Sequence, residues 1–201
     1  RHRSQVDRVS NRLKNDALDG GKDILPLLEF ALDQLYQKRE VKNGRTQLTW
    51  AAYEEMGGLQ GAIGNRADEV LHSLDESAQE ALGRVLRSLA KLRRDSVQTE
   101  GGKSPFIASD VDVEQFPSGT PARRLIDAFA DARLFGRDRG NEGVAQVRVT
   151  HEALFTHWAK ADEILKYSMK DMVVRERLTD SEAHWKAKDE AMSLLLQPGL
   201  P

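Results

Sequence analysis

The chain has 201 residues, 39% of them hydrophobic and 31% charged, a size and composition typical of a charge-rich helical protein with one large core or two small ones. Its formal net charge of −2 gives no overall reason to expect nucleic-acid binding, and no apolar run approaches the roughly 20 residues that span a bilayer. The absence of cysteine excludes disulfides and thiolate metal sites and fits a cytoplasmic protein, which is what we expect.

Apolar spacing and turn residues mark the first two helices. The first helix, with Val9 and Leu13 on its buried face, ends before the turn at Asp19-Gly20-Gly21. The second helix runs from Ile24 to Tyr36 and carries Pro26 in its first turn, where the missing N–H would have no partner in any case. Because this helix is apolar on nearly every side, we expect it to be buried among other helices.

Two more helices complete a first predicted unit, residues 1–74. Thr49 is placed to cap a short helix from Trp50 to Met56. A longer helix, Leu59 to Leu74, follows the pair Gly57-Gly58. These residues together predict a helical subdomain.

A second predicted unit begins at Asp75, which is placed to cap a helix. The apolar stripe of this helix extends over about four turns to Leu92. The polar stretch 93–105 indicates a loop or a short strand, and Ser109 is placed to cap a short helix through Phe116.

The end of this unit indicates a helix followed by a β-hairpin. Thr120-Pro121 open the helix, and residues 133–137 and 144–150 form the two strands. Three helices followed by a hairpin are the outline of a winged helix, which we assign to residues 75–160. The predicted fold is therefore mainly α: a helical lid subdomain, a winged helix and a C-terminal helical connector over residues 161–201.

The chain changes from strand to helix near residue 150, and a charged pair lies at the change. Helical spacing starts at Ala153, and Thr150 is placed as its cap. His151 and Glu152 then lie in the first turn, where free N–H groups and the helix dipole favour a nearby negative charge. An imidazole there can donate to a phosphate oxygen, so this corner is a candidate phosphate sensor. We expect the chain to be helical from His151 onward.

Motifs for several kinds of chemistry are missing from the sequence. No Gly-x-x-x-x-Gly-Lys-Ser/Thr loop is present to hold a triphosphate, no His-x-x-x-His pair to hold a metal, and no Gly-x-Ser-x-Gly elbow to carry a nucleophile. We therefore predict no catalytic and no metal-binding residues, and we expect these residues alone not to be an enzyme. The chain starts at Arg1 rather than Met, which we interpret as part of a longer protein.

Three segments, in the same order as in a known family, span most of the chain. The first runs from Leu25 to Tyr36 and continues with Leu48 to Gly58, the second runs from Val149 to Trp158, and the third from Leu178 to Leu196. Together they resemble the STAND class of signalling P-loop NTPases, in the bacterial branch associated with WD40 repeats.

The resemblance implies a role for each part of the chain. Residues 1–74 would be the helical lid behind a P-loop nucleotide-binding domain, residues 75–160 the winged helix, and residues 161–201 a connector to a C-terminal sensor of the WD40 kind. The upstream domain and the sensor would be partners within the same chain. The class also suggests a homo-oligomer in the active state, whereas neither nucleic acid nor a membrane is implied.

The resemblance also implies a nucleotide site. ADP or ATP, with Mg²⁺, would be bound by the parent protein and not by these residues alone. Leu25, Pro26 and Leu27 resemble the proline motif that packs against adenine and ribose, and His151 and Glu152 resemble a histidine–acid pair whose histidine approaches the β-phosphate of ADP. Exchange of ADP for ATP would remove that contact and let the winged helix rotate, which predicts a regulatory module that senses the nucleotide state.

Simpler interpretations of the same residues stay open. Pro26 can be an ordinary first-turn proline of a buried helix, and His151 a histidine bonded to a neighbouring carbonyl. The arginines between Arg123 and Arg148 also allow a DNA-binding winged-helix transcriptional regulator, although interleaved acidic residues leave only a small excess of positive charge. A helical protein-interaction adaptor with no link to a nucleotide is a further alternative.

Overall fold

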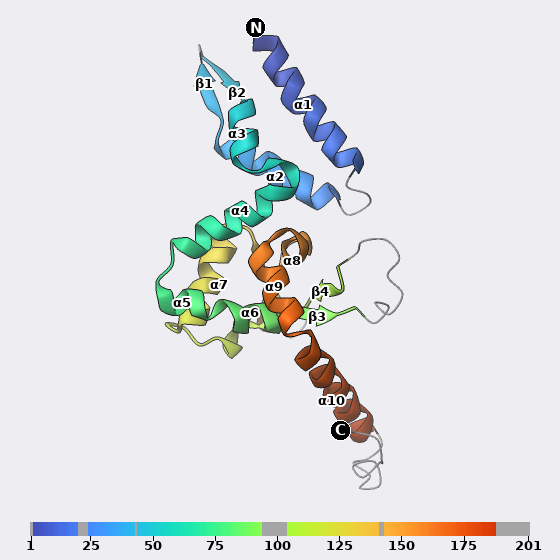
Figure 1. Cartoon of the computed structure of the whole chain (residues 1–201). Helices are drawn as coiled ribbons and strands as arrows, with labels where there is room; N and C mark the ends of the chain where they lie inside the picture. Colours follow the sequence, from blue (N-terminus) through green and yellow to red (C-terminus); the bar gives the residue numbers. More distant parts are fainter. Residues whose placement is uncertain (1, 20–23, 43, 94–103, 141–142, 188–201) are drawn as a thin grey trace.

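The computed structural model describes residues 2–19, 24–42, 44–93, 104–140 and 143–187, and it is mainly helical with small antiparallel sheets, as the sequence predicts (Figure 1). The molecule is elongated: the N-terminal helix lies near one end, and the last helix extends from the other (Figure 1). None of the helices in these ranges combines the length and the apolar character that crossing a bilayer requires.

The first helices agree with the predicted spacing, and a short β-hairpin that the sequence does not predict lies among them. The elements are α1 (His2–Asp19), α2 (Ile24–Gln37), β1 (Glu40–Lys42), β2 (Arg45–Gln47), α3 (Trp50–Glu55) and α4 (Gly58–His72). Val9 and Leu13 bury one face of α1, as expected. The hydroxyl of Thr49 accepts the N–H of Ala52 at 3.3 Å, which confirms the predicted cap of α3.

Helix α2 is buried along one side only, so the prediction that it is buried among other helices is wrong for its other side. Leu27 and Leu35 belong to the core. In contrast, Leu25, Leu32 and Tyr36 are 69%, 41% and 57% exposed. The physical reason is that α2 packs against α1 and α4, which leaves its opposite side without a partner in the part of the chain that the structure describes.

The second half of the chain begins with short helices and strands. They are α5 (Glu76–Glu80), α6 (Leu82–Leu89), β3 (Ala90–Leu92) and β4 (Phe106–Ala108). The carboxylate of Asp75 accepts the N–H of Ala78 at 3.1 Å, which confirms the predicted cap. The helix ends earlier than its apolar stripe predicts, because Leu92 lies in β3 and pairs with the buried Phe106 of β4.

The short helix predicted after Ser109 is wrong. This segment forms β5 (Val111–Asp112) and the 3₁₀ turn η2 (Val113–Gln115), and the cap of η2 is Asp112, whose carboxylate accepts the N–H of Glu114 at 2.8 Å. Ser109 is buried, and its N–H donates to the carbonyl oxygen of Leu89 at 2.8 Å. Ser109 therefore lies between β4 and β5 and bonds to the end of α6 instead of starting a helix.

The predicted helix and hairpin that follow are confirmed, and the hairpin belongs to a three-stranded sheet. The elements are α7 (Pro121–Asp131), β6 (Phe135–Arg139) and β7 (Ala145–Val149). The hydroxyl of Thr120 accepts the N–H of Arg123 at 3.3 Å and caps α7 as predicted. Strand β5 pairs with the free edge of β7, which gives the antiparallel order β5-β7-β6.

The chain after β7 is helical, as predicted, but its helices start at Ala153 instead of His151 and are interrupted twice. Its helices are α8 (Ala153–His157), α9 (Ala159–Tyr167) and α10 (Met169–Ala187), with an extended residue, Trp158, between α8 and α9. Thr150 does not cap α8; the residue before α8 is Glu152, which makes no capping bond. The N–H of Thr150 donates to the carbonyl oxygen of Leu134 at 3.0 Å, so Thr150 still belongs to the hairpin.

Helix α4 packs tightly against the chain at the junction of α8 and α9. The ring of Trp158 is buried, and its Nε1–H donates to the carboxylate of Asp68 in α4 at 3.0 Å. Gly64 comes so close that a Cβ there would lie 2.6 Å from the carbonyl oxygen of His157, so only glycine fits. The helices on both sides of residue 74 therefore share one hydrophobic core.

Candidate functional site

His151 lies at the corner between β7 and α8, beside helix α2. Its carbonyl oxygen accepts the N–H of Leu154 at 3.0 Å, which fixes the first turn of α8. Its ring meets the ring of Phe30 edge to face, with the two centroids 6.1 Å apart. Two segments that are far apart in the sequence thus meet at this histidine.

The surroundings of His151 favour a neutral ring. Burial lowers the pKa of His151 below its ordinary 6.5, and the negative charge of Glu29 opposes this shift only in part. At pH 7 the imidazole therefore carries one N–H donor and one acceptor nitrogen. Such a ring can donate a hydrogen bond to an anion without the cost of burying a charge.

Glu152 binds a different part of the molecule. One carboxylate oxygen accepts the N–H of Ala108 in β4 at 3.0 Å, and the other lies 3.4 Å from Nη2 of Arg93, just after β3. Glu152 therefore fastens the β3–β4 hairpin to the corner. The two members of the predicted histidine–acid pair have separate neighbours, α2 for His151 and the hairpin for Glu152.

The part of α2 that lies against His151 is the turn around Phe30. Pro26 is in the first turn of α2, as predicted, and its position is four residues before Phe30, on the same helix face. The side chain of Pro26 lies outside the described part of the structure. Of its two neighbours, Leu25 is largely exposed and accessible to a ligand, whereas Leu27 is part of the core. The structure thus places Phe30, one turn after Pro26, against His151.

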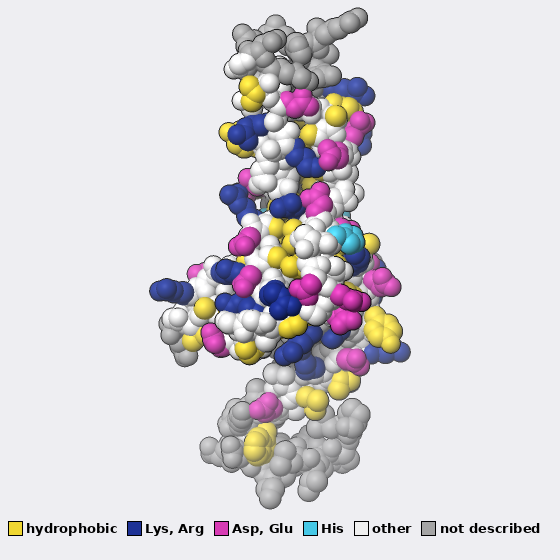
Figure 2. Space-filling view, turned by 90° about the vertical axis from the view of Figure 1, so that its left-hand side faces the viewer, with side chains coloured by type: hydrophobic (Ala, Val, Ile, Leu, Met, Phe, Trp, Pro, Cys, Tyr) yellow, Lys and Arg dark blue, Asp and Glu magenta, His cyan; other side chains and the backbone are white. Residues whose placement is uncertain are grey.

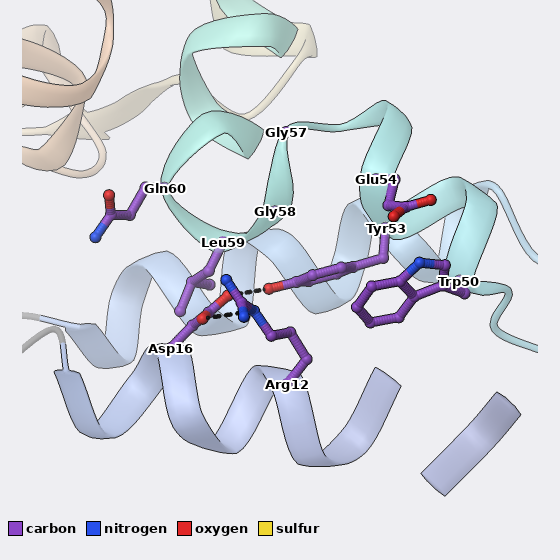
Figure 3. Close-up of a pocket in the computed structure, with 9 residues that line it drawn as sticks. All are labelled: Arg12, Asp16, Trp50, Tyr53, Glu54, Gly57, Gly58, Leu59 and Gln60. Atoms are coloured by element: carbon purple, nitrogen blue, oxygen red, sulfur yellow. Dashed lines mark hydrogen bonds and ion pairs between the residues drawn. The ribbon is translucent and has the colours of Figure 1, made fainter. Parts of the chain in front are cut away.

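A second candidate site, which the sequence does not predict, is a pocket of about 690 Å³ between α1, α3 and the start of α4 (Figure 3). Its lining includes Arg12 and Asp16 of α1, Trp50, Tyr53 and Glu54 of α3, and Leu59 and Gln60 of α4. Four-residue spacing places Arg12 with Asp16, and Trp50 with Glu54, on one helix face each. Nothing in the local sequence indicates that these two faces meet.

Tyr53 ties α1 to the start of α4 at this pocket. Its hydroxyl donates to one carboxylate oxygen of Asp16, and the other oxygen lies 3.0 Å from Nε of Arg12 (Figure 3). Burial and the bond to Asp16 raise the pKa of Tyr53 to about 12, against a smaller opposite effect of the Leu59 N–H. The phenol therefore stays protonated, and the link between the helices persists at physiological pH.

Metal ligands do not gather in either region: among the described residues, no three histidine, aspartate or glutamate side chains lie close enough together to hold an ion.

Comparison with known proteins gives a family model with the description Novel STAND NTPase 1, which matches residues 2–193. This match includes both candidate sites. No curated protein and no solved structure matches the chain.

Proposed function

Because the chain belongs to the Novel STAND NTPase 1 family, we propose that it is the part of a STAND-class ATPase that senses the nucleotide state, between an upstream P-loop domain and a downstream sensor. The observation that carries this proposal is the contact of His151 with Phe30, one turn after Pro26. A histidine and a helix start from distant parts of the chain there form one region that a nucleotide on a neighbouring domain can contact.

The residues of this region fit one edge of a nucleotide but not its phosphate cradle. The neutral ring of His151 offers one N–H to a phosphate oxygen, and the exposed apolar side chain of Leu25 lies at the start of the same helix, on a different face from Phe30. A phosphate loop is absent from the sequence, so a neighbouring domain must hold the phosphates and carry out any hydrolysis. Exchange of ADP for ATP, each bound with Mg²⁺, would supply the change in phosphate charge that this region senses.

We also assign residues 75–160 to a winged helix. Helix α7 leads into the β6–β7 hairpin, and β5, which precedes α7, pairs with the other edge of β7. This order of helices and strands supports the assignment. Residues 161–201 then form the connector to the sensor.

The contact between α4 and the junction of α8 and α9 provides a route from His151 to the rest of the protein. The corner leads directly into α8, and Trp158 follows α8 with its bond to Asp68. Lys160 also binds Asp68, at 3.2 Å. Because this junction is closely packed, it would hold one arrangement until a contact at His151 changes, as a nucleotide-biased two-state switch requires.

The arginines of the proposed winged helix do not favour DNA recognition. Arg123 and Arg137 both bind Asp127, and Arg124 binds Asp75. Figure 2 shows basic and acidic side chains interspersed over the face that it presents. A surface that follows a phosphate backbone is more one-sided. We therefore favour nucleotide sensing over DNA binding as the function.

The proposal is tested with His151→Ala in the full-length protein. A hydrogen bond to a charged group contributes about 1.5–3 kcal/mol, so loss of the imidazole is expected to speed ADP release by about 10- to 150-fold. Stopped-flow fluorescence of a labelled ADP measures this rate. His72→Ala is the control, because His72 is exposed at the end of α4. ADP release that is unchanged by His151→Ala would remove the sensing role.

A further inference from the structure

Arg133 follows α7 in a backbone conformation that residues other than glycine rarely adopt. Its φ is 61°, and the five other residues with a positive φ in the described part of the chain are all glycines. The N–H of Arg133 donates to the carbonyl oxygen of Ala130, and the N–H of Leu134 to that of Phe129, both at 2.9 Å. This is the pattern of a Schellman turn, in which glycine usually occupies the position of Arg133, so the arginine there strains the backbone.

The turn by itself gives no reason for an arginine at this position. Ala132 and Leu134 are buried on either side, so the core fixes the path of the backbone whichever residue lies between them. The side chain of Arg133 is 71% exposed and adds little to that core. The use of an arginine must therefore lie in the contact that its guanidinium makes.

The guanidinium of Arg133 binds helix α2, in the other half of the chain. Its Nη1 donates to Oδ1 of Asp33 at 3.1 Å, and Nε2 of Gln37 donates to the second carboxylate oxygen at 2.8 Å. The bond from Gln37, one turn further along α2, orients the carboxylate. The side chain of Asp33 is 30% exposed, so the ion pair is partly shielded from water and salt.

This ion pair lies next to the ring contact of the proposed sensing region. Asp33 comes three residues after Phe30 on α2, and the ring of Phe30 meets the ring of His151. Beside the arginine, the carbonyl oxygen of Leu134 accepts the N–H of Thr150, the residue before the histidine. The ion pair and the ring contact thus join the same two parts of the chain.

We propose that Arg133 and Asp33 form a latch that holds the turn of α2 around Phe30 against the corner that contains His151. In the open form the rings of Phe30 and His151 are apart. An ion pair of this exposure is a weak contact, so the latch shifts the balance between closed and open forms by a few-fold and yields to salt or to a competing contact. Only the consequence of opening, which is faster ADP release, rests on the proposed sensing role of His151.

The latch is tested in the 201-residue chain labelled with 4-fluorophenylalanine, with the ¹⁹F resonance of Phe30 assigned from Phe30→Leu. Relaxation dispersion of this resonance measures the open fraction. Asp33→Asn is expected to raise the open fraction by about 2- to 5-fold. Arg133→Lys should leave it nearly unchanged, because the contact with Asp33 uses a single N–H.

Asp162→Asn is the matched control. It breaks the ion pair of Asp162 with Lys166 inside α9, and the side chain of Asp162 is 33% exposed, close to the value for Asp33. The open fraction should stay unchanged. High salt should raise the open fraction of the unaltered chain but not that of Asp33→Asn, since only the former still has an ion pair to screen.

Arg133→Gly separates the latch from a merely structural role. It removes the same ion pair as Asp33→Asn and should raise the open fraction equally, but it also relieves the strained turn. It is therefore expected to unfold at a temperature about 2–4 °C higher than Asp33→Asn. An open fraction unchanged in both variants, an equal rise with Asp162→Asn, or Arg133→Gly unfolding below Asp33→Asn would overturn the proposal.

ADP release from the full-length protein distinguishes the latch from the sensing role. Asp33→Asn is expected to speed release by about 2- to 5-fold, the same factor by which it raises the open fraction. A raised open fraction with unchanged ADP release would support the latch and contradict sensing at His151.

Discussion

Gly64 is the residue at which α4 comes closest to the chain that follows α8. A Cβ at this position would lie 2.6 Å from the carbonyl oxygen of His157 and 3.5 Å from the Cα of Trp158. Both are backbone atoms and have no rotamer that moves them away. Any side chain at position 64 must therefore separate α4 from α8 or distort one of them.

Gly64→Ala is expected to lower the free energy of unfolding by about 1–3 kcal/mol, the usual cost of overpacking. Urea unfolding followed by circular dichroism measures it. Gly83→Ala is the control in α6, where a Cβ meets the end of the flexible Arg87 side chain at 3.1 Å. Since alanine is the better helix former, Gly83→Ala should stabilise the protein by about 0.5–1 kcal/mol. A Gly64→Ala variant as stable as the unaltered chain would show that the two helices can separate freely.

Three helix starts are predicted correctly from the sequence, whereas the caps predicted at Ser109 and Thr150 are wrong. The caps at Thr49, Asp75 and Thr120 each bond to the N–H three residues later, so all the necessary information is local. The edges of the sheet depend on distant residues instead. β5 pairs with β7, and the N–H of Thr150 bonds to Leu134, and neither pairing is visible in a local pattern.

The same distinction applies to the candidate site. The change from strand to helix identifies the corner that contains His151, but the ring of Phe30 comes from a helix far away in the sequence. The partners of Glu152 are also distant, in β4 and after β3. The pocket next to α1 requires two helix faces to meet in the folded chain, which spacing within either helix does not determine.

A pair of threonines tests the caps directly. Thr120→Ala removes the side-chain bond at the start of α7 and is expected to cost about 0.5–2 kcal/mol of stability. Thr150→Ala is expected to change stability by less than about 0.5 kcal/mol, because Thr150 is exposed and contributes its backbone, not a side-chain cap. Thermal unfolding of both variants measures the difference. If Thr150→Ala were the more damaging change, the assignment of the α8 start would be wrong.

The whole molecule combines one shared core with an uncovered apolar surface on α2. The core joins helices from both halves of the chain, whereas Leu25, Leu32 and Tyr36 face outward. Large apolar side chains in one row are typical of a surface that contacts another protein or domain.

The 201-residue chain by itself is expected to bind ADP and ATP weakly or not at all, since it contributes one edge of the site and no phosphate loop. Isothermal titration calorimetry with the chain at micromolar concentration should show no saturable heat. The full-length protein, titrated in the same buffer with Mg²⁺, is the positive control. Micromolar affinity in the 201-residue chain would mean that its own residues form a complete nucleotide site.

Helix α10 leaves the body of the protein and extends away from it (Figure 1). Its first turns are anchored by the buried Met172 and by Arg175, whose guanidinium donates to the carbonyl oxygen of Arg87 at 3.3 Å. Its 19 residues span about 28 Å at about 1.5 Å per residue. A tilt of about 10° at Ser168 would therefore carry its far tip through about 5 Å, which is a large displacement for a small change at the root of the helix.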